Sequence, residues 1–137
     1  MTLADAGPLI ALLNARDRHH RACVRAAETI EDALGTTWPV VTEALYLLAG
    51  AWRAQAELFA WLERGDLLLL PLHVSDLPRL RALMRTYRNL PMDLADASLV
   101  RVAERDRMRR VFTLDRRGFS VYRAAGFGAL ELVPASV

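Results

Sequence analysis

The chain has 137 residues, 53% hydrophobic and 25% charged, which excludes a disordered protein and is typical of one domain with its own core. Its longest apolar run, Leu67–Leu72, is far shorter than the roughly 20 residues of a membrane helix, and no stretch resembles a signal peptide. The lone Cys23 excludes an internal disulfide. We therefore expect a cytoplasmic protein. The formal net charge is +2 without a single lysine, which excludes a phosphate-binding P-loop and argues against a receiver domain.

Helical and strand patterns alternate from end to end, without a repeat or a linker. This alternation predicts an α/β domain with a mostly parallel sheet. The predicted strands are, in chain order, Thr2–Asp5, Thr36–Trp38, Leu67–Pro71, Arg110–Leu114 and Ala129–Val133, the last at an edge. The predicted helices are Gly7–Leu13, Asp17 to about Leu34, Val41 to near Gly50, Ala54–Glu63, Ser75 to about Arg88, and Asp93–Arg107.

Five acidic residues lie where a predicted strand ends or a predicted helix begins. They are Asp5, Glu43, Asp93, Asp96 and Asp115. The first ends a predicted strand, the last follows one, and the other three lie in first turns of predicted helices. Each has a structural explanation on its own, because carboxylates at such positions cap helices or close turns. Together they indicate a site, because parallel sheets bind ligands beyond the carboxyl ends of their strands.

Four or five carboxylates in one crevice repel each other strongly. Two unit charges about 4 Å apart repel by roughly 4 kcal/mol at an effective dielectric constant near 20. Such a cluster persists when protons or cations neutralise it, and Mg²⁺ or Mn²⁺ is the natural counter-ion because both prefer oxygen ligands. A metal there supports phosphodiester hydrolysis, since it lowers the pKa of a water. His19, His20 and His73 do not have the spacing of metal ligands.

Five segments carry a resemblance to a known family. In chain order they are Asp5 with Gly7–Leu13, Asp17 with His20, Thr42–Leu48, Asp93–Ala97 and Phe112–Asp115. Their order and spacing resemble the PIN-domain family, in particular the VapC-type toxins, over nearly the whole chain. One departure is that Ala6 and Gly7 follow Asp5, where many members have a serine or threonine, so that a side-chain contact near the metal is missing.

The resemblance implies a single PIN domain over residues 1–137, with a three-layer α/β/α fold around a mostly parallel central sheet. It also implies an endoribonuclease that requires Mg²⁺ or Mn²⁺. By position, Asp5, Glu43 and Asp96 match the three central catalytic acids, and Asp115 matches the fourth, more variable one. The expected metal ligands are Asp5, Asp96 and Asp115, with the additional acid Asp93 ranked below Asp96.

The residues expected to bind the substrate are Thr113, which matches a hydroxyl residue of the family, and Arg116 and Arg117. All 18 basic residues of the chain are arginines, whose planar guanidinium group suits phosphate contacts. A codon bias towards arginine explains this composition equally well, and a solvated helix end explains the two arginines after Asp115.

The expected partners are single-stranded RNA as the substrate and a cognate antitoxin. We expect the antitoxin to lay an apolar helix into a groove and to place a basic side chain at the carboxylates. Trp52, Phe59 and Trp61 carry more aromatic area than one buried helix face needs, which predicts a homodimer; ordinary core packing is the alternative. Two other functions remain open, a non-catalytic module that binds RNA or protein and a structure-selective DNA nuclease.

Overall fold

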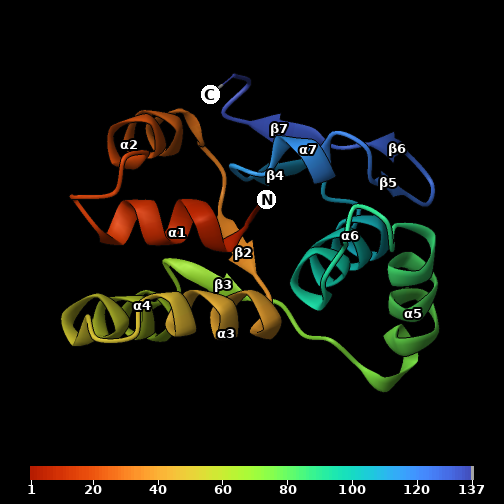
Figure 1. Cartoon of the computed structure of the whole chain (residues 1–137), viewed down its shortest axis with the longest axis horizontal. Helices are drawn as coiled ribbons and strands as arrows, with labels where there is room; N and C mark the ends of the chain where they lie inside the picture. The colour runs from red at the N-terminus through yellow and green to blue at the C-terminus, as the bar shows by residue number, and fades with distance from the viewer. Residues whose placement is uncertain (137) are drawn as a thin grey trace.

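Five short parallel strands form the central sheet of the structure, a computed structural model that describes residues 1–136 (Figure 1). Neighbouring strands are parallel throughout this sheet. The connection after β1 leads to β2, whereas the connection after β4 leads to β7 on the other side. The order across the sheet is β3 (Leu67–Leu69), β2 (Leu34–Thr36), β1 (Thr2–Ala4), β4 (Arg110–Phe112) and β7 (Glu131–Val133).

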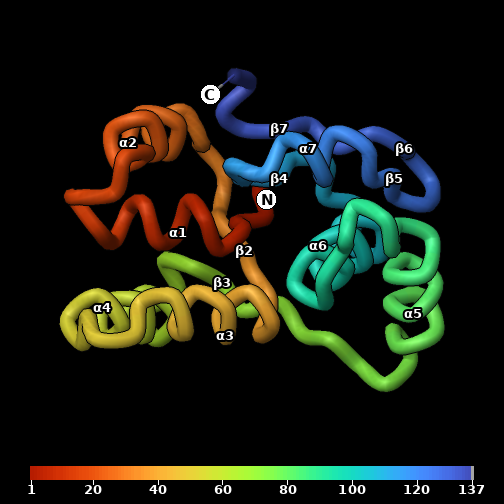
Figure 2. The backbone as a smooth tube through the Cα atoms, viewed as in Figure 1, coloured from red at the N-terminus to blue at the C-terminus, as the bar shows by residue number. Residues whose placement is uncertain are grey.

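Helices cover both faces of the sheet, so the predicted three-layer α/β fold is confirmed (Figures 1 and 2). The two groups lie on opposite faces because crossovers between parallel strands are right-handed and the chain reverses its direction across the sheet after β3. Among the described residues, no helix is long and apolar enough to cross a membrane. One face carries α1 (Ala6–Leu13), α2 (His20–Thr29), α3 (Trp38–Leu47) and α4 (Trp52–Arg64), and the other carries α5 (Leu77–Thr86) and α6 (Leu94–Asp106).

Several small elements complete the chain. They are the 3₁₀ turn η1 (Val74–Asp76), the single-turn helix α7 (Arg116–Phe119) and the antiparallel hairpin of β5 (Arg123–Ala124) and β6 (Gly128–Ala129). Neither α7 nor this hairpin was predicted, because one helical turn and two-residue strands are too short to show a periodic pattern.

The helix α6 is the most deeply buried helix of the fold. Ala97, Leu99, Val100 and Val102 are completely enclosed in the main core. A smaller cluster of Ala11, Cys23, Ala26 and Phe112 lies under α1 and α2. Because α6 is fixed along its length, the residues of its first turn have defined positions relative to the sheet.

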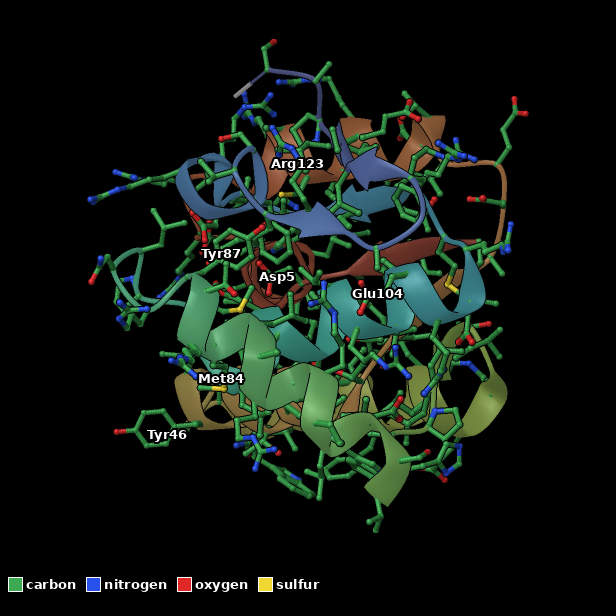
Figure 3. All side chains as sticks on the ribbon, turned by 90° about the vertical axis from the view of Figure 1, so that its right-hand side faces the viewer. Asp5, Tyr46, Met84, Tyr87, Glu104 and Arg123 are labelled. Carbon is green, nitrogen blue, oxygen red and sulfur yellow. The ribbon has the colours of Figure 1, made fainter. Side chains whose placement is uncertain are left out.

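Two buried acids on the α5–α6 side are paired with arginines. Glu104 accepts hydrogen bonds from Arg79 Nε (2.6 Å) and from the backbone N–H of Ala125 (2.6 Å). It thereby connects α5, α6 and the β5–β6 hairpin, and Figure 3 shows it on α6. The buried Asp76 is bound by Arg101 and Arg105. Burial alone would raise the pKa of Asp76. The two arginines and the backbone N–H of His73 outweigh this effect and hold the pKa below its usual value.

The largest difference from the predicted elements lies between α2 and α3. The second helix ends at Thr29, not near Leu34, and the next strand is Leu34–Thr36, two residues earlier than predicted. The reason is Pro39, which does not end the strand but lies in the first turn of α3, where proline is favoured.

Candidate active site

The five acids singled out in the sequence line one pocket of about 400 Å³. The pocket lies beyond the carboxyl ends of β1 and β4, the two strands whose connections leave in opposite directions, and such a switch point is where open α/β sheets bind ligands. None of the lining residues, all of them within the described part of the chain, is an arginine or a histidine. The lining residues are Asp5, Ala6, Gly7, Glu43, Leu47, Asp93, Asp96, Leu114 and Asp115.

Asp5 is the most enclosed of these acids, with only 7% of the residue exposed, and Figure 3 shows it in the interior. Its Oδ1 accepts from the backbone N–H of Ala6 and its Oδ2 from the hydroxyl of Thr113, both at 2.8 Å. Burial raises the pKa of this carboxyl against the opposing effect of these two bonds, and the neighbouring Asp115 and Asp93 add to the rise. Asp5 is therefore both the cap of α1 and a fixed wall of the pocket.

Asp93 and Asp96, both at the start of α6, have different roles. Asp93 caps the helix, because its Oδ1 accepts from the backbone N–H of Asp96 at 2.8 Å. The side chain of Asp96 does not cap; its Oδ2 accepts instead from the hydroxyl of Tyr122 at 3.0 Å. Burial, followed by the charges of Asp93 and Asp5, raises the pKa of Asp96 from 3.8 to about 7.

Glu43 reaches the pocket from α3. It is half-buried, and its residue neighbours on α3, Val41 and Ala44, belong to the core. Burial and the charges of Asp93 and Asp5 raise the pKa of Glu43 from 4.5 to about 6. The surroundings thus raise the pKa values of three carboxyl groups of the pocket, those of Asp5, Glu43 and Asp96.

Asp115 lies in the pocket as the N-terminal cap of α7. Its Oδ1 accepts from the backbone N–H of Gly118 at 3.1 Å, and its own N–H donates to Thr113 Oγ1 at 3.0 Å. Gly118 allows the close approach: a Cβ on it would lie 2.7 Å from the Tyr122 hydroxyl and 2.8 Å from Asp115 Oδ2. Only glycine leaves room for both side chains here.

Thr113 lies behind Asp5, between Asp5 and the backbone of Asp115. Its side chain is fully buried and does not line the pocket, since its hydroxyl donates to Asp5 and accepts from the Asp115 N–H. In the structure Thr113 thus has the position of a residue that holds Asp5. Arg116 donates to the carbonyl of Pro134 at 2.7 Å, and Arg117 is exposed on α7; neither lines the pocket.

Tyr122 is the residue of the site that sequence reasoning missed. It is buried against Tyr87 and Phe119, with ring centroids 5.0 and 5.1 Å away, so its hydroxyl points at Asp96 from a rigid aromatic cluster. The only indication of this contact in the sequence is Gly118, three positions after Asp115. Tyr122 itself could not be identified, because no spacing rule relates a tyrosine to an acid on a distant helix.

The donor set fits a divalent cation that keeps part of its water shell. Elsewhere the buried acids Asp76 and Glu104 are neutralised by arginines, whereas the acids of this pocket face one another. Within residues 1–136 no three acidic, histidine or cysteine side chains form a preassembled metal cluster. Mg²⁺ does not require one, because proteins bind it through one or two carboxylates while several waters remain.

The comparisons with known proteins agree with this architecture, a parallel α/β domain with an acidic pocket at its switch point. The family model described as "PIN domain" matches residues 2–125. The chain belongs to the PIN-domain family. It is 31% identical over 134 residues to Ribonuclease VapC26 of Mycobacterium tuberculosis, covering 96% of this chain and 99% of the relative.

Two solved structures have the same fold as this chain. The crystal structure of VapC20 from Mycobacterium tuberculosis, described as a sarcin-ricin loop cleaving toxin, matches with a TM-score of 0.80 at 19% identity, covering 93% of this chain and 96% of that chain. A toxin-antitoxin complex from Klebsiella pneumoniae matches with a TM-score of 0.67 at 20% identity, covering 100% and 96%. At these identities the two structures establish the fold alone.

Proposed function

We propose that this protein is a cytoplasmic, metal-dependent endoribonuclease and the toxin of a toxin–antitoxin pair. The observation that carries the proposal is the convergence of Asp5, Glu43, Asp96 and Asp115 in one pocket without a balancing basic side chain. Membership of the PIN-domain family and the similarity to a relative named as a ribonuclease support RNA as the substrate.

Each acid has a part in the proposed reaction. Asp5 and Asp96, assisted by Asp93 and Asp115, would hold Mg²⁺ or Mn²⁺, which when bound supplies the Lewis acid for phosphodiester hydrolysis. Glu43 lines the same pocket from α3, and in the proposed reaction its carboxylate would accept a proton from the attacking water. Thr113 and Tyr122 hold Asp5 and Asp96 in place through their hydroxyl groups.

The basic charge near the pocket lies on α7. The substrate-binding role of Arg116 and Arg117 remains part of the proposal: Arg117 is exposed one helical turn or less from Asp115, and such a position suits a phosphate outside the pocket. Arg116 would have to leave its bond to Pro134 to take part.

A cleavage assay tests the proposal. The purified protein is incubated with single-stranded RNA, with double-stranded RNA and with DNA, each in Mg²⁺, Mn²⁺ or EDTA. Cleavage of RNA that EDTA abolishes and that Asp96→Asn lacks is the expected result. Cleavage of DNA alone would favour the structure-selective DNA nuclease, and RNA binding without cleavage under every condition would favour a non-catalytic module.

A groove with both polar and apolar lining residues, beside the pocket, suits the antitoxin. It has a volume of about 840 Å³ and lies between the end of α1 and the turn from α3 to α4, with Ile10, Leu13, Leu47 and Trp52 among its lining residues. Because Leu47 lines both this groove and the acidic pocket, an apolar segment in the groove can place a basic residue at the acids. Co-purification with the product of the adjacent reading frame, and protection of growth by it, would support this partner; failure of both would oppose it.

A further inference from the structure

A second groove opens on the other side of the acidic pocket. Its volume is about 480 Å³, and its walls are the first turns of α3 and α6, with Trp38 and Pro39 on one side and Leu94 and Ala95 on the other. Trp38 is 57% exposed, although it is the first residue of a helix whose next turn is buried. An exposed indole in this position is not explained by the core.

This groove is continuous with the acidic pocket. Glu43 and Asp93 line both. A polymer with its scissile phosphate at the acids therefore places the neighbouring part of the same nucleotide, or of the next one, in the groove. This argument rests on the proposed function, because it takes the acidic pocket as the place of cleavage.

The two walls of the groove are fixed relative to each other. Thr37, directly before Trp38, shares a hydrogen bond of 2.6 Å with Ser98 on α6, and both side chains are fully buried. The hydroxyl of Thr42 donates to the carbonyl of Trp38 at 3.0 Å, which holds the first turn of α3. The groove is thus preformed, and an occupant need not order it.

The chemistry of the lining favours a nucleobase over a phosphate. No arginine or histidine is among the lining residues, all of which the structure describes, whereas two acids, Glu43 and Asp93, are among them. A phosphate would be repelled there. A base is uncharged, its faces stack on an indole, and its amino groups can donate to carboxylates.

We infer that Trp38 is the stacking platform of a nucleobase subsite, which holds an unpaired base of single-stranded RNA next to the cleaved phosphate. The base lies between the indole of Trp38 and the side chain of Leu94, while the edge of the base faces Glu43 and Asp93. Such a subsite selects single-stranded RNA, because a base in a duplex cannot leave its stack to enter the groove without unpairing.

The test combines protein variants with abasic substitutions in the RNA. Trp38→Ala is expected to lower kcat/KM on a short single-stranded RNA by about 10- to 100-fold, mostly through KM, and Trp38→Phe to retain most of the activity. The matched control is Tyr46→Ala, an exposed aromatic residue on the same helix (78% exposed) that points away from the molecule in Figure 3. It is expected to behave as the wild type.

An abasic nucleotide at the position that occupies the groove should weaken cleavage by the wild type as Trp38→Ala does. It should have little further effect on Trp38→Ala, because the stacking partner is already gone. A second readout avoids cleavage altogether: in the Asp96→Asn background, Trp38→Ala should raise the Kd for the same RNA by a similar factor, with an unchanged thermal melt.

Four outcomes would overturn the inference. Wild-type cleavage by Trp38→Ala, or additive effects of Trp38→Ala and every abasic substitution, would show that no base stacks on the indole. A Trp38→Ala protein that becomes monomeric and regains full activity at high concentration would assign the groove to a second copy of the chain. Absence of RNA cleavage by the wild type would instead defeat the proposed function itself, and the inference with it.

Discussion

At the scale of single residues, Asp96 is the acid whose substitution separates chemistry from folding. Asp96→Asn removes one charge at nearly constant volume, and the side chain that caps α6 is Asp93, so no helix cap is lost. We expect RNA cleavage to fall by about 100-fold or more. The thermal melting temperature in EDTA should hold or rise, because one source of repulsion in the pocket disappears. Cleavage assays and melts on the same preparations measure both effects.

Asp93→Ala is the matched control at the same helix end. It removes the cap and should destabilise the protein by about 1 kcal/mol. If Asp96→Asn instead melted early and still cleaved RNA, the pocket would be an assembly of caps and not an active site.

Thr113 offers a second test at this scale. Thr113→Val keeps the shape but leaves Asp5 Oδ2 and the Asp115 N–H without their partner, at an expected loss of about 1–3 kcal/mol in the free energy of unfolding. Thr113→Ser restores the hydroxyl and should recover most of both stability and cleavage. Denaturant unfolding curves check the order wild type, Ser, Val; equal stability of Ser and Val variants would contradict the positioning role.

At the scale of elements, α7 depends on the absence of a side chain at Gly118. A Cβ there would meet the Tyr122 hydroxyl at 2.7 Å and Asp115 Oδ2 at 2.8 Å, so Gly118→Ala should displace both groups. We expect reduced cleavage together with a loss of stability of about 1–3 kcal/mol, as for other overpacked sites. Cleavage rates and unfolding curves of the single variant measure the two effects.

The double variant Gly118→Ala/Tyr122→Phe distinguishes this clash from a general weakening of α7. Removal of the hydroxyl removes the nearest of the contacts, so the double variant should be less destabilised than the sum of the two single variants predicts. Strict additivity would mean that the steric account of this turn is wrong.

At the scale of the whole molecule, the pocket gives the metal-free protein an unusual dependence on pH. The pKa values of Asp96 and Glu43 are raised to about 7 and about 6 in the folded state. At pH values between the ordinary and the raised pKa values, the folded state therefore binds more protons than the unfolded state. Their contribution is complete below the ordinary values of 3.8 and 4.5 and is lost as the pH rises through the raised values. The acids paired with arginines, such as Asp76, act in the opposite direction only at lower pH.

We therefore expect the melting temperature in EDTA to fall between about pH 5 and pH 8, with a smaller fall for Asp96→Asn. Water reaches the pocket and screens its charges, so the difference between the two proteins should be on the order of 1–2 kcal/mol. Mn²⁺ should reverse the trend for the wild type, because it replaces the lost protons. If the melting temperatures of both proteins depended on pH in the same way, the raised pKa of Asp96 would not be the cause of the fall.

The predicted homodimer also belongs to this scale. Trp52 and Phe59 are 70% and 40% exposed on α4, whereas Trp61 is partly buried against the core, so two of the three predicted aromatic residues remain available for a contact. We expect a dimer by light scattering at tens of micromolar, and a shift towards monomer for Phe59→Ala. A wild type that stays monomeric would contradict the dimer, and the exposure of Trp52 would then be explained by the groove proposed for the antitoxin.

The acids and most helices could be predicted from the sequence because they depend on local rules. Asp5 and Asp115 follow buried strands, and topology alone brings the ends of adjacent parallel strands together. The same rules failed where a choice depended on distant packing: Pro39 could end a strand or begin a helix, and only the position of α3 decides. Tyr122 was not predictable, since its bond to Asp96 joins residues 26 positions apart.

The pairing of β1 with β4 has a consequence for synthesis on the ribosome. The bond from Thr113 to Asp5 joins residues 108 positions apart, and β1 has no partner at β4 until Arg110 to Phe112 have emerged. At about 5–20 residues per second, a nascent chain carries Asp5 for several seconds before the pocket can close around it. The proposed ribonuclease is therefore expected to stay inactive until β4 and Thr113 have emerged and paired with β1 and Asp5. A partner that recognises α1, α3 and α4 has that interval to bind first.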